Sequence, residues 1–372
     1  MRIAINTLGS QGRAYGGARY IRSLVSWLAK VDPKNEYVLY VSREDVPRFS
    51  GLAPNFQLVP TVAYRPLRIL WEQAGLPWDL ERRRVDVYHG PGFVAPLIKT
   101  TRQVITIHDM TFFLLPECHH FTKRHYFRCL IPKCVRRANQ VIAVSENTKR
   151  DIIRVLGSEG EKIKVVYHGK DEGFHPDRAA TTSCRLRAKY GLPMRVILFV
   201  GLIEPRKNLE RLVRAYAKLK NLHQDSCLLL AGRLGWGYQA VFRAVSESGV
   251  KDRVILPGFI PERELPSLYN LADVVVYPSL YEGFGLPVLE AMACGVPVVT
   301  SRVSSMPEIA GDAALLVDPY DVGDIAQALE RALVDRALRE RLANEGPKRC
   351  QPFTWQRTAR ETLAVYEEVA GK

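Results

Sequence analysis

Short hydrophobic runs alternate with segments of helical periodicity along the whole chain. In the first half, runs rich in Val and Ile end in polar residues or glycine, whereas residues 18–29 carry apolar side chains three or four positions apart. This alternation is typical of βαβ units and predicts a parallel sheet. The expected strands of that sheet are Ile3–Asn6, Tyr37–Val41, Gln57–Val59, Asp86–His89, Val104–His108, Gln140–Ser145 and Lys164–Gly169.

A second alternation follows Gly173–Tyr190, a segment that begins with turn-forming residues. We expect an α/β protein in which each alternation forms one Rossmann-like, doubly wound domain, with the two domains facing a central cleft. The first domain is predicted over residues 1–175 and the second over residues 176–352, and a closing helix over about 353–372 begins near the capping residue Thr354. The expected strands of the second domain are Val196–Val200, Cys227–Ala231, Val254–Leu256, Val274–Tyr277, Pro297–Thr300 and Ala314–Val317.

The composition is that of an ordinary globular protein. The 372 residues are 47% hydrophobic and 25% charged, which is enough for two separate cores. The first residues read as a strand rather than a signal peptide, and no uncharged apolar run reaches the ~18 residues that a membrane-spanning helix needs. We therefore expect a cytoplasmic protein. Its seven cysteines form no CxxC pair and are expected to be reduced thiols.

The formal net charge of +14 is concentrated in the first half. Residues 1–190 contain 31 Lys and Arg against 17 Asp and Glu, whereas residues 191–372 contain 22 of each kind. This imbalance indicates an acidic partner for the first domain, which could be an anionic lipid, a lipid-linked phosphate or a nucleic acid. Nucleic acid is not expected, because no known binding motif is present and the basic residues are spread over many elements.

The densest basic stretch, His119–Arg137, has two interpretations that the sequence leaves open. It could lie on an anionic membrane surface, which would make the protein peripheral on the inner face of the cytoplasmic membrane. It could equally be a solvated helix that turns Phe127, Leu130 and Val135 toward the core. Pro132 is expected to interrupt a long helix here.

The strongest candidate site is a glycine-containing loop that opens a short helix. Glu282 precedes the loop, and Gly285 and Pro287 suit a helix start, so the unpaired N–H groups of the first turn would face a bound anion. Glu290 lies about one turn into the helix, where it could accept both hydroxyls of a ribose. We predict a nucleotide-sugar site whose donor-binding residues are Gly283, Phe284, Gly285, Leu286 and Glu290.

Two adjacent cations follow the first strand of the second domain. Arg206 and Lys207 lie at the carboxyl end of that strand, which is the edge where open α/β sheets bind ligands. They could clamp a diphosphate and neutralise the charge that develops as it leaves. The alternative is a solvated pair on a loop, and the strand-end position favours the phosphate role.

The first domain contributes weaker candidates. Gly16 and Gly17 come just after the first strand and would allow a phosphate or sugar to approach the backbone. His108 ends a strand beside Asp109. A lone histidine is most often a structural residue, but the strand-end position favours contact with the transferred sugar.

Several motifs are absent from the sequence. It has no GxxxxGK[ST], HExxH or GxSxG motif, and no DxD pair of the type that holds a metal under a nucleoside diphosphate. We therefore expect neither a metal nor a cofactor, and cationic side chains and a helix terminus would stabilise the leaving group instead.

Together these motifs resemble those of retaining glycosyltransferases of family 4, which have the GT-B fold, and especially those of bacterial polysaccharide mannosyltransferases. Glu282 to Glu290 matches the E-x7-E motif of that family, Glu204–Asn208 its basic phosphate motif, and His108–Asp109 its amino-domain histidine motif. The resemblance implies that Glu290 binds the ribose and Glu282 orients the sugar. It also implies that His108, Arg206, Lys207 and Glu282 are the catalytic residues, and that the final helix crosses back to the first domain.

The resemblance also implies a reaction and its substrates. The family transfers a hexose with retention, by a front-face displacement in which the leaving diphosphate helps to deprotonate the acceptor hydroxyl. The form of the motifs favours GDP-mannose over UDP-glucose or UDP-N-acetylglucosamine, with a saccharide or lipid-linked saccharide acceptor in cell-surface polysaccharide synthesis. In two places this sequence departs from the pattern: Leu202 stands where many members have Arg, and the interdomain segment reads His168–Asp171.

Overall fold

The computed structural model describes residues 1–10, 16–62, 64–177 and 180–371, which form two compact units. The first unit comprises Met1–Gly169 and Phe353–Lys372, and the second comprises Lys170–Pro352. Residues 170–175, which the sequence assigned to the first domain, therefore belong to the second. They are held there because Phe174 packs edge-on against Tyr269, with ring centroids 5.7 Å apart.

The described part of the first unit contains a parallel sheet of seven strands in the order β3-β2-β1-β4-β5-β6-β7. Its strands turn Val, Ile and Leu to both faces, as expected for a sheet covered by helices on both sides. The strand predicted over Lys164–Gly169 is shorter in the structure, because only Ile163–Val165 pairs with its neighbour β6. The strands are β1 (Arg2–Asn6), β2 (Glu36–Ser42), β3 (Phe56–Thr61), β4 (Val87–Gly90), β5 (Arg102–Ile107), β6 (Gln140–Ala143) and β7 (Ile163–Val165).

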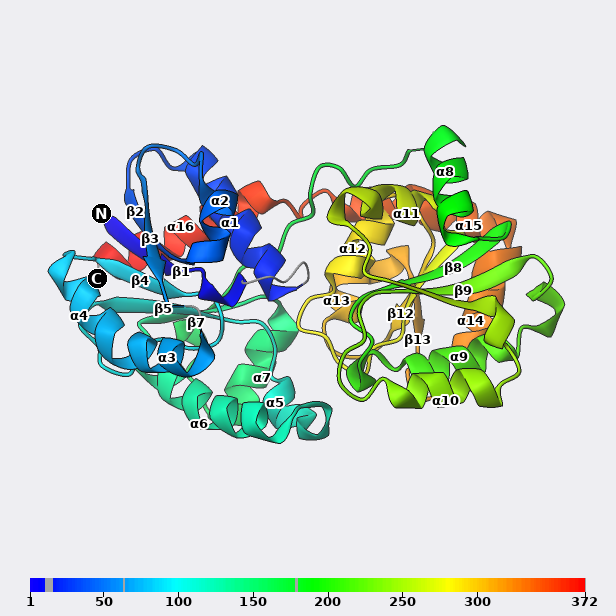
Figure 1. Ribbon diagram of the computed structural model, residues 1–372, viewed down its shortest axis with the longest axis horizontal. Coiled ribbons are helices and arrows are strands. Elements are labelled where there is room, and N and C mark those ends of the chain that lie inside the picture. Colours follow the sequence, from blue (N-terminus) through cyan, green and yellow to red (C-terminus); the bar gives the residue numbers. More distant parts are fainter. Residues whose placement is uncertain (11–15, 63, 178–179, 372) are drawn as a thin grey trace. The chain divides into compact units, whose positions relative to one another are not determined.

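Helices cover both faces of this sheet. Figure 1 shows α1 and α16 on one face and α3, α4 and α6 on the other. A short π-helix, η3 (Trp71–Gly75), joins α3 to α4. The helices are α1 (Gly17–Val31), α2 (Val46–Phe49), α3 (Arg65–Leu70), α4 (Leu76–Arg82), α5 (Thr111–Leu114), α6 (Phe121–Arg137), α7 (Glu146–Leu156) and α16 (Trp355–Gly371).

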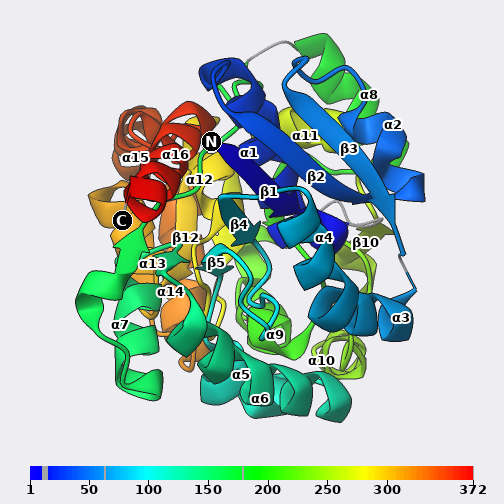
Figure 2. The ribbon, with the colours of Figure 1, turned by 90° about the vertical axis from the view of Figure 1, so that its left-hand side faces the viewer.

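The last helix, α16, completes the core of the first unit. It lies beside α1 in both Figure 1 and Figure 2. Trp355 and Tyr366 are fully buried, and the Tyr366 hydroxyl is 2.6 Å from Nδ1 of His89. The chain therefore leaves the first unit at Gly169 and returns to it at Phe353.

Helix α6 runs without interruption through Pro132, so the expected break is absent. Pro132 removes one backbone donor, but Ile131, Cys134 and Val135 are buried around it, and this packing holds the helix together. Phe127 also packs against the core. The solvated-helix interpretation thus holds for Phe127 and Val135, whereas Leu130 is partly buried and does not belong to this core cluster.

The second unit contains a parallel sheet of six strands in the order β10-β9-β8-β11-β12-β13 within its described residues. In Figure 1, α9, α10 and α14 lie on one face of this sheet and α11 and α12 on the other. The strands are β8 (Arg195–Val200), β9 (Ser226–Ala231), β10 (Val254–Gly258), β11 (Val274–Tyr277), β12 (Val298–Ser301) and β13 (Leu315–Val317). The helices are α8 (Ala180–Tyr190), α9 (Leu209–Ala217), α10 (Gln239–Glu247), α11 (Leu265–Leu271), α12 (Leu286–Ala293), α13 (Met306–Ala310), α14 (Val322–Val334) and α15 (Arg336–Cys350).

Candidate functional site

The main candidate residues of the second unit follow two neighbouring strands. β8 and β11 pair in parallel, so the loops after them leave the same edge of the sheet. The loop after β8 forms a 3₁₀ turn over Pro205–Lys207, and the loop after β11 leads into α12. The two loops are joined directly, because the backbone N–H of Leu280 donates to the carbonyl of Arg206 at 2.9 Å.

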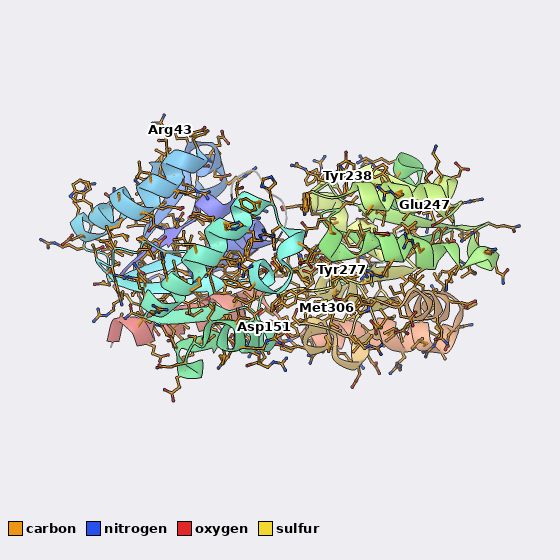
Figure 3. The ribbon with its side chains drawn as sticks, turned by 90° about the horizontal axis from the view of Figure 1, so that it is seen from below. Arg43, Asp151, Tyr238, Glu247, Tyr277 and Met306 are labelled. Carbon is orange, nitrogen blue, oxygen red and sulfur yellow. The ribbon has the colours of Figure 1, made fainter. Side chains whose placement is uncertain are left out.

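Glu282 forms ion pairs with both predicted cations. Arg206 donates from Nη1 to Glu282 Oε2 at 2.7 Å, and Lys207 donates from Nζ to Glu282 Oε1 at 2.6 Å. Arg206 also donates from Nη2 to Glu204 at 2.9 Å, and Lys207 to the Tyr277 hydroxyl at 2.6 Å. We call Glu204, Arg206, Lys207, Tyr277 and Glu282 the charged cluster; Tyr277 is labelled in Figure 3.

Because the cluster is largely buried, its charged side chains interact strongly with one another. Burial alone opposes ionisation of Glu282, but the Arg206 and Lys207 charges outweigh it and lower the pKa of Glu282 to about 2. Burial and repulsion from Arg206 lower the pKa of Lys207, and Glu282 opposes that shift. Glu282 is therefore a carboxylate throughout the physiological range, and it holds the two cations side by side.

Asn208 fixes the turn that carries the two cations. Its backbone is left-handed, with φ at 60°, and its side-chain amide donates to the carbonyls of Pro278 and Pro319 at 3.0 and 2.6 Å. A non-glycine residue in this conformation costs free energy, and here the two hydrogen bonds offset that cost. The turn is thus tied to both neighbouring loops.

The start of α12 is formed by Gly285, as the sequence predicts. Gly285 has φ at 108°, and the hydroxyl of Ser305 donates to the carbonyls of Glu282 and Phe284, each at 2.9 Å. Phe284 and Leu286 turn buried side chains away from solvent. Gly283 to Leu286 would therefore contact a ligand through the backbone.

Glu290 lies inside α12 and is only 2% exposed. Its Oε2 accepts a hydrogen bond from the Tyr269 hydroxyl at 3.0 Å. The carboxylate is thus held by α11, the helix that also packs against α12.

In the first unit, His108 follows β5 and lies among aromatic rings. The ring centroids of Tyr20, Phe93 and His168 lie 5.1, 5.4 and 5.7 Å from that of His108. Its Nε2 is 2.8 Å from the carbonyl of Pro91, which fixes the proton on Nε2 and makes Nδ1 an acceptor. Burial lowers the pKa of His108, so the ring is neutral at physiological pH.

Gly17 starts α1 next to His108. A Cβ on Gly17 would lie 3.6 Å from Nε2 of His108, which is an ordinary contact, so packing alone does not require glycine. Gly16 has φ at 59°, a conformation that does favour glycine. The preceding residue Tyr15, part of the same motif, lies outside the described residues.

Comparison with known proteins identifies the family. Residues 14–173 match the description "Glycosyltransferase Family 4", and residues 185–349 match "Glycosyl transferases group 1". O-antigen chain mannosyltransferase B of Escherichia coli is 34% identical over 292 residues, which are 78% of this chain and 76% of that protein. The chain belongs to glycosyltransferase family 4.

Two further proteins are similar to this glycosyltransferase. The serotype-specific mannosyltransferase WbdA of Escherichia coli is 34% identical over 227 residues, which are 60% of this chain and 28% of that much longer protein. The sucrose-phosphate synthase of Thermosynechococcus elongatus matches 99% of both chains with a TM-score of 0.81 and 24% identity. The expected GT-B fold is thereby confirmed, and the enzyme is a hexosyltransferase.

The structure also reveals residues of this glycosyltransferase that sequence reasoning missed. Tyr277 was predicted only as the end of a strand, yet its hydroxyl accepts from Lys207. His89 is fully buried, with Nδ1 near Tyr366 and Nε2 2.8 Å from the Thr106 hydroxyl, and burial lowers its pKa to about 3. Both are polar residues at the ends of predicted strands, and that position was the available signal.

Proposed function

We propose that this enzyme transfers mannose from GDP-mannose to a saccharide or lipid-linked saccharide acceptor, with retention, in cell-surface polysaccharide synthesis. The observation that carries the proposal is the 34% identity to the Escherichia coli O-antigen chain mannosyltransferase B over 78% of this chain. The site geometry supports a donor that carries a diphosphate and a ribose.

The charged cluster would bind the diphosphate. Lys207 has three N–H donors, and two of them serve Glu282 and Tyr277 among the described residues, which leaves one for a phosphate oxygen. Arg206 is partly exposed and lies beside Lys207. Two adjacent cations stabilise the negative charge that grows on the leaving diphosphate.

Glu290 would bind the ribose and Glu282 would orient the transferred sugar. Tyr269 holds one oxygen of Glu290 in place at 3.0 Å, and a carboxylate is an acceptor that suits the two hydroxyls of a ribose. In the first turn of α12, Pro287 has no N–H and Val288 donates its N–H to the carbonyl of Gly285 at 3.0 Å. The N–H of Leu286 is therefore the donor of this turn that would face the diphosphate.

In the first unit, Gly16, Gly17 and His108 would meet the donor sugar. Nδ1 of His108 is the acceptor nitrogen of a neutral ring, so it would accept a hydrogen bond from a sugar hydroxyl. Gly16 and Gly17 have no side chains, so the sugar could approach their backbone at the start of α1.

Retention would follow from a front-face displacement. The bond between sugar C1 and the diphosphate oxygen breaks, and that oxygen takes the proton of the acceptor hydroxyl. The acceptor oxygen then bonds to C1 on the same face of the ring. The positive charges of Arg206 and Lys207 would supply the stabilisation, so we expect transfer without an added metal.

A donor panel tests the proposal. The protein is incubated with GDP-mannose, UDP-glucose or UDP-N-acetylglucosamine, and both thermal stabilisation and slow donor hydrolysis are measured. We expect GDP-mannose to give the largest effect, with activity retained in EDTA and an α-linked product from the α-linked donor. A larger response to either UDP-sugar would overturn the donor assignment, and a product of inverted configuration would overturn the mechanism.

A matched pair of variants tests whether Glu290 binds the ribose of the donor. Glu290→Gln is expected to weaken donor binding by about tenfold or more, since it removes a charged acceptor from the ribose. The control Glu247→Gln changes an exposed carboxylate on α10, labelled in Figure 3, and should leave donor binding unchanged. Equal donor affinity in the wild type and Glu290→Gln would contradict the ribose assignment.

A further inference from the structure

Two cross-links join the ends of β4 and β5 in the first unit. Nε2 of His89 on β4 lies 2.8 Å from the hydroxyl oxygen of Thr106 on β5. Two residues further along each segment, the carbonyl of Pro91 accepts a hydrogen bond from Nε2 of His108, also at 2.8 Å. Because the two strands pair in parallel, both cross-links lie at the carboxyl edge of the sheet, and the first supports the strand ends from which the second arises.

The first cross-link is the middle of a longer chain of hydrogen bonds. Nδ1 of His89 lies 2.6 Å from the hydroxyl of Tyr366 on α16, and the Thr106 hydroxyl lies 3.1 Å from that of Tyr20 on α1. All four side chains are fully buried. We call Tyr366, His89, Thr106 and Tyr20 the buried polar chain. It connects two helices on one face of the sheet (Figure 1) with the ends of two strands.

Thr106 also holds two of the aromatic rings that surround His108. Tyr20, which is bonded to the Thr106 side chain, packs edge-on against the His108 ring with centroids 5.1 Å apart. Phe93 also packs edge-on against that ring at 5.4 Å, and its backbone N–H donates to the Thr106 carbonyl at 3.0 Å. Thr106 therefore fixes two rings that orient His108.

The loop after β4 has an unusual backbone that needs this support. Phe93 is left-handed, with φ at 74°, which costs free energy for a residue with a side chain. Gly90, next to His89, has no room for a side chain, because a Cβ there would collide with the carbonyl of Val94. The same loop carries Pro91, whose carbonyl holds the proton of His108 on Nε2. The conformation of this loop therefore determines which nitrogen of His108 can accept a hydrogen bond.

His89 does not meet a bound ligand itself, because its side chain is fully buried. Burial lowers its pKa to about 3, so the ring is neutral, with one nitrogen that donates and one that accepts. The hydroxyls of Tyr366 and Thr106 can each donate or accept, so they satisfy either form of the ring. Buried polar groups that are all hydrogen-bonded favour a single arrangement of their side chains.

We propose that His89 is a positioning residue for sugar transfer. Its hydrogen bond to Thr106 holds the His108 ring in the orientation that presents the acceptor nitrogen Nδ1 to the transferred sugar. Tyr366 anchors the far end of the buried polar chain, so the last helix supports this contact in addition to filling the core. This role depends on the proposed function only for the contact between His108 and the sugar.

A spectroscopic test needs neither donor nor acceptor. The histidines of the full chain are labelled with a nitrogen isotope, and NMR records the Nε2–H signal of His108, which is assigned by its absence from His108→Gln. The amide of Gln in His89→Gln can reach the position of Nε2 and keep the bond to Thr106, whereas the shorter Asn in His89→Asn can reach only that of Nδ1. We expect the His108 signal to stay in place in His89→Gln and to shift or broaden in His89→Asn. An unchanged signal in both variants would overturn the proposal.

A pair of substitutions at Thr106 separates positioning from packing. Thr106→Val keeps the shape of the side chain and loses the hydroxyl, whereas Thr106→Ser keeps the hydroxyl and loses a methyl group. With the donor that the panel above identifies, we expect kcat to fall about tenfold in Thr106→Val, with little change in the KM for donor, and to stay near the wild-type value in Thr106→Ser. Both variants should lose some thermal stability, since Thr106 is fully buried. An equal kcat in the two variants would overturn the positioning role.

Tyr37→Phe is the control for the loss of a buried hydrogen bond. The Tyr37 hydroxyl donates to Asp32 at 2.6 Å in the same unit, but Tyr37 lies near the amino end of β2, away from the carboxyl edge of the sheet. We expect this variant to lose stability and to keep the wild-type kcat. A fall in kcat as large as that of Thr106→Val would show that activity only follows stability, and would overturn the positioning role. If the wild type used no nucleotide sugar, the proposed function would fail, and the NMR comparison would still decide whether His89 orients His108.

Discussion

Lys207 is buried together with Glu282 and Arg206 is partly buried, so both cations depend on the carboxylate. Glu282 and Lys207 are 7 and 6% exposed, and Arg206 is largely covered. Breaking a buried ion pair is costly because it leaves an uncompensated charge in a medium of low polarity. Substitutions of single residues can measure how far the two cations depend on Glu282.

Glu282→Gln should destabilise the second unit by about 3 kcal/mol at pH 7, because the buried Lys207 and the partly buried Arg206 lose their carboxylate. Thermal and urea unfolding would measure the loss, and transfer activity should fall as well. Glu204→Gln is the control, since the Glu204 carboxylate pairs with Arg206, whereas Glu204 contacts Lys207 through its backbone carbonyl, which the substitution keeps. An equal loss in both variants would contradict the central role of Glu282.

The same variant has a defined pH dependence. The pKa of Glu282 is lowered from 4.5 to about 2, so its ionisation stabilises the fold above about pH 4.5 and this stabilisation is lost as pH falls toward 2. The stability gap between the wild type and Glu282→Gln should therefore be constant from pH 7 to about 5 and shrink below that. Unfolding midpoints over this range would show it, and a gap that widened in acid would refute it.

Tyr277 positions Lys207 and should affect turnover rather than donor binding. Tyr277→Phe removes the hydroxyl at 2.6 Å and is expected to lower kcat by about tenfold, with little change in the KM for donor. Lys207→Ala should lower kcat much further. A Tyr277→Phe enzyme with normal kcat and a raised KM would show that the hydroxyl binds donor instead.

Position along the strands explains which residues could be predicted. Arg206, Lys207 and Glu282 follow strands, and Glu290 lies one turn into a helix. The sequence periodicity locates those places. The sequence could not show that Glu282 pairs with both cations, because that contact joins loops about seventy-five residues apart.

At the scale of elements, the start of α12 depends on one glycine. Gly285 has φ at 108°, and an added Cβ would meet the side chain of Met306, which is labelled in Figure 3. Gly285→Ala should destabilise the second unit by about 1–3 kcal/mol, more than the control Gly249→Ala, which has a similar backbone but open space around it. Equal effects in thermal unfolding would mean that only the backbone conformation matters.

Element boundaries were predicted less well than element order. Pro132 lies inside α6 although a proline usually ends a helix, because buried neighbours on α6 hold it in place. The first unit ends at Gly169 although the turn-forming residues begin later, because Phe174 already packs in the second unit. Both outcomes depend on tertiary packing, which local sequence patterns do not contain.

At the scale of the whole molecule, α16 decides whether the first unit folds. Deleting residues 353–371 would remove Trp355 and Tyr366 from its core and leave His89 without the Tyr366 hydroxyl. Each lost aromatic side chain costs about 3–5 kcal/mol, so the first unit should unfold while the second persists. Limited proteolysis would then leave a resistant fragment near residues 170–352, and Arg357→Ala/Glu361→Ala, an exposed pair on α16, is the control.

The order of the units along the chain also determines which unit can finish folding first during translation. A ribosome makes the seven strands of the first unit early, yet the helix that covers one face of their sheet emerges only after the entire second unit. The second unit, whose residues are continuous, can fold as soon as they emerge. The part of the enzyme that is translated first is therefore the last to become complete, and until then its nascent sheet exposes the surface that chaperones recognise.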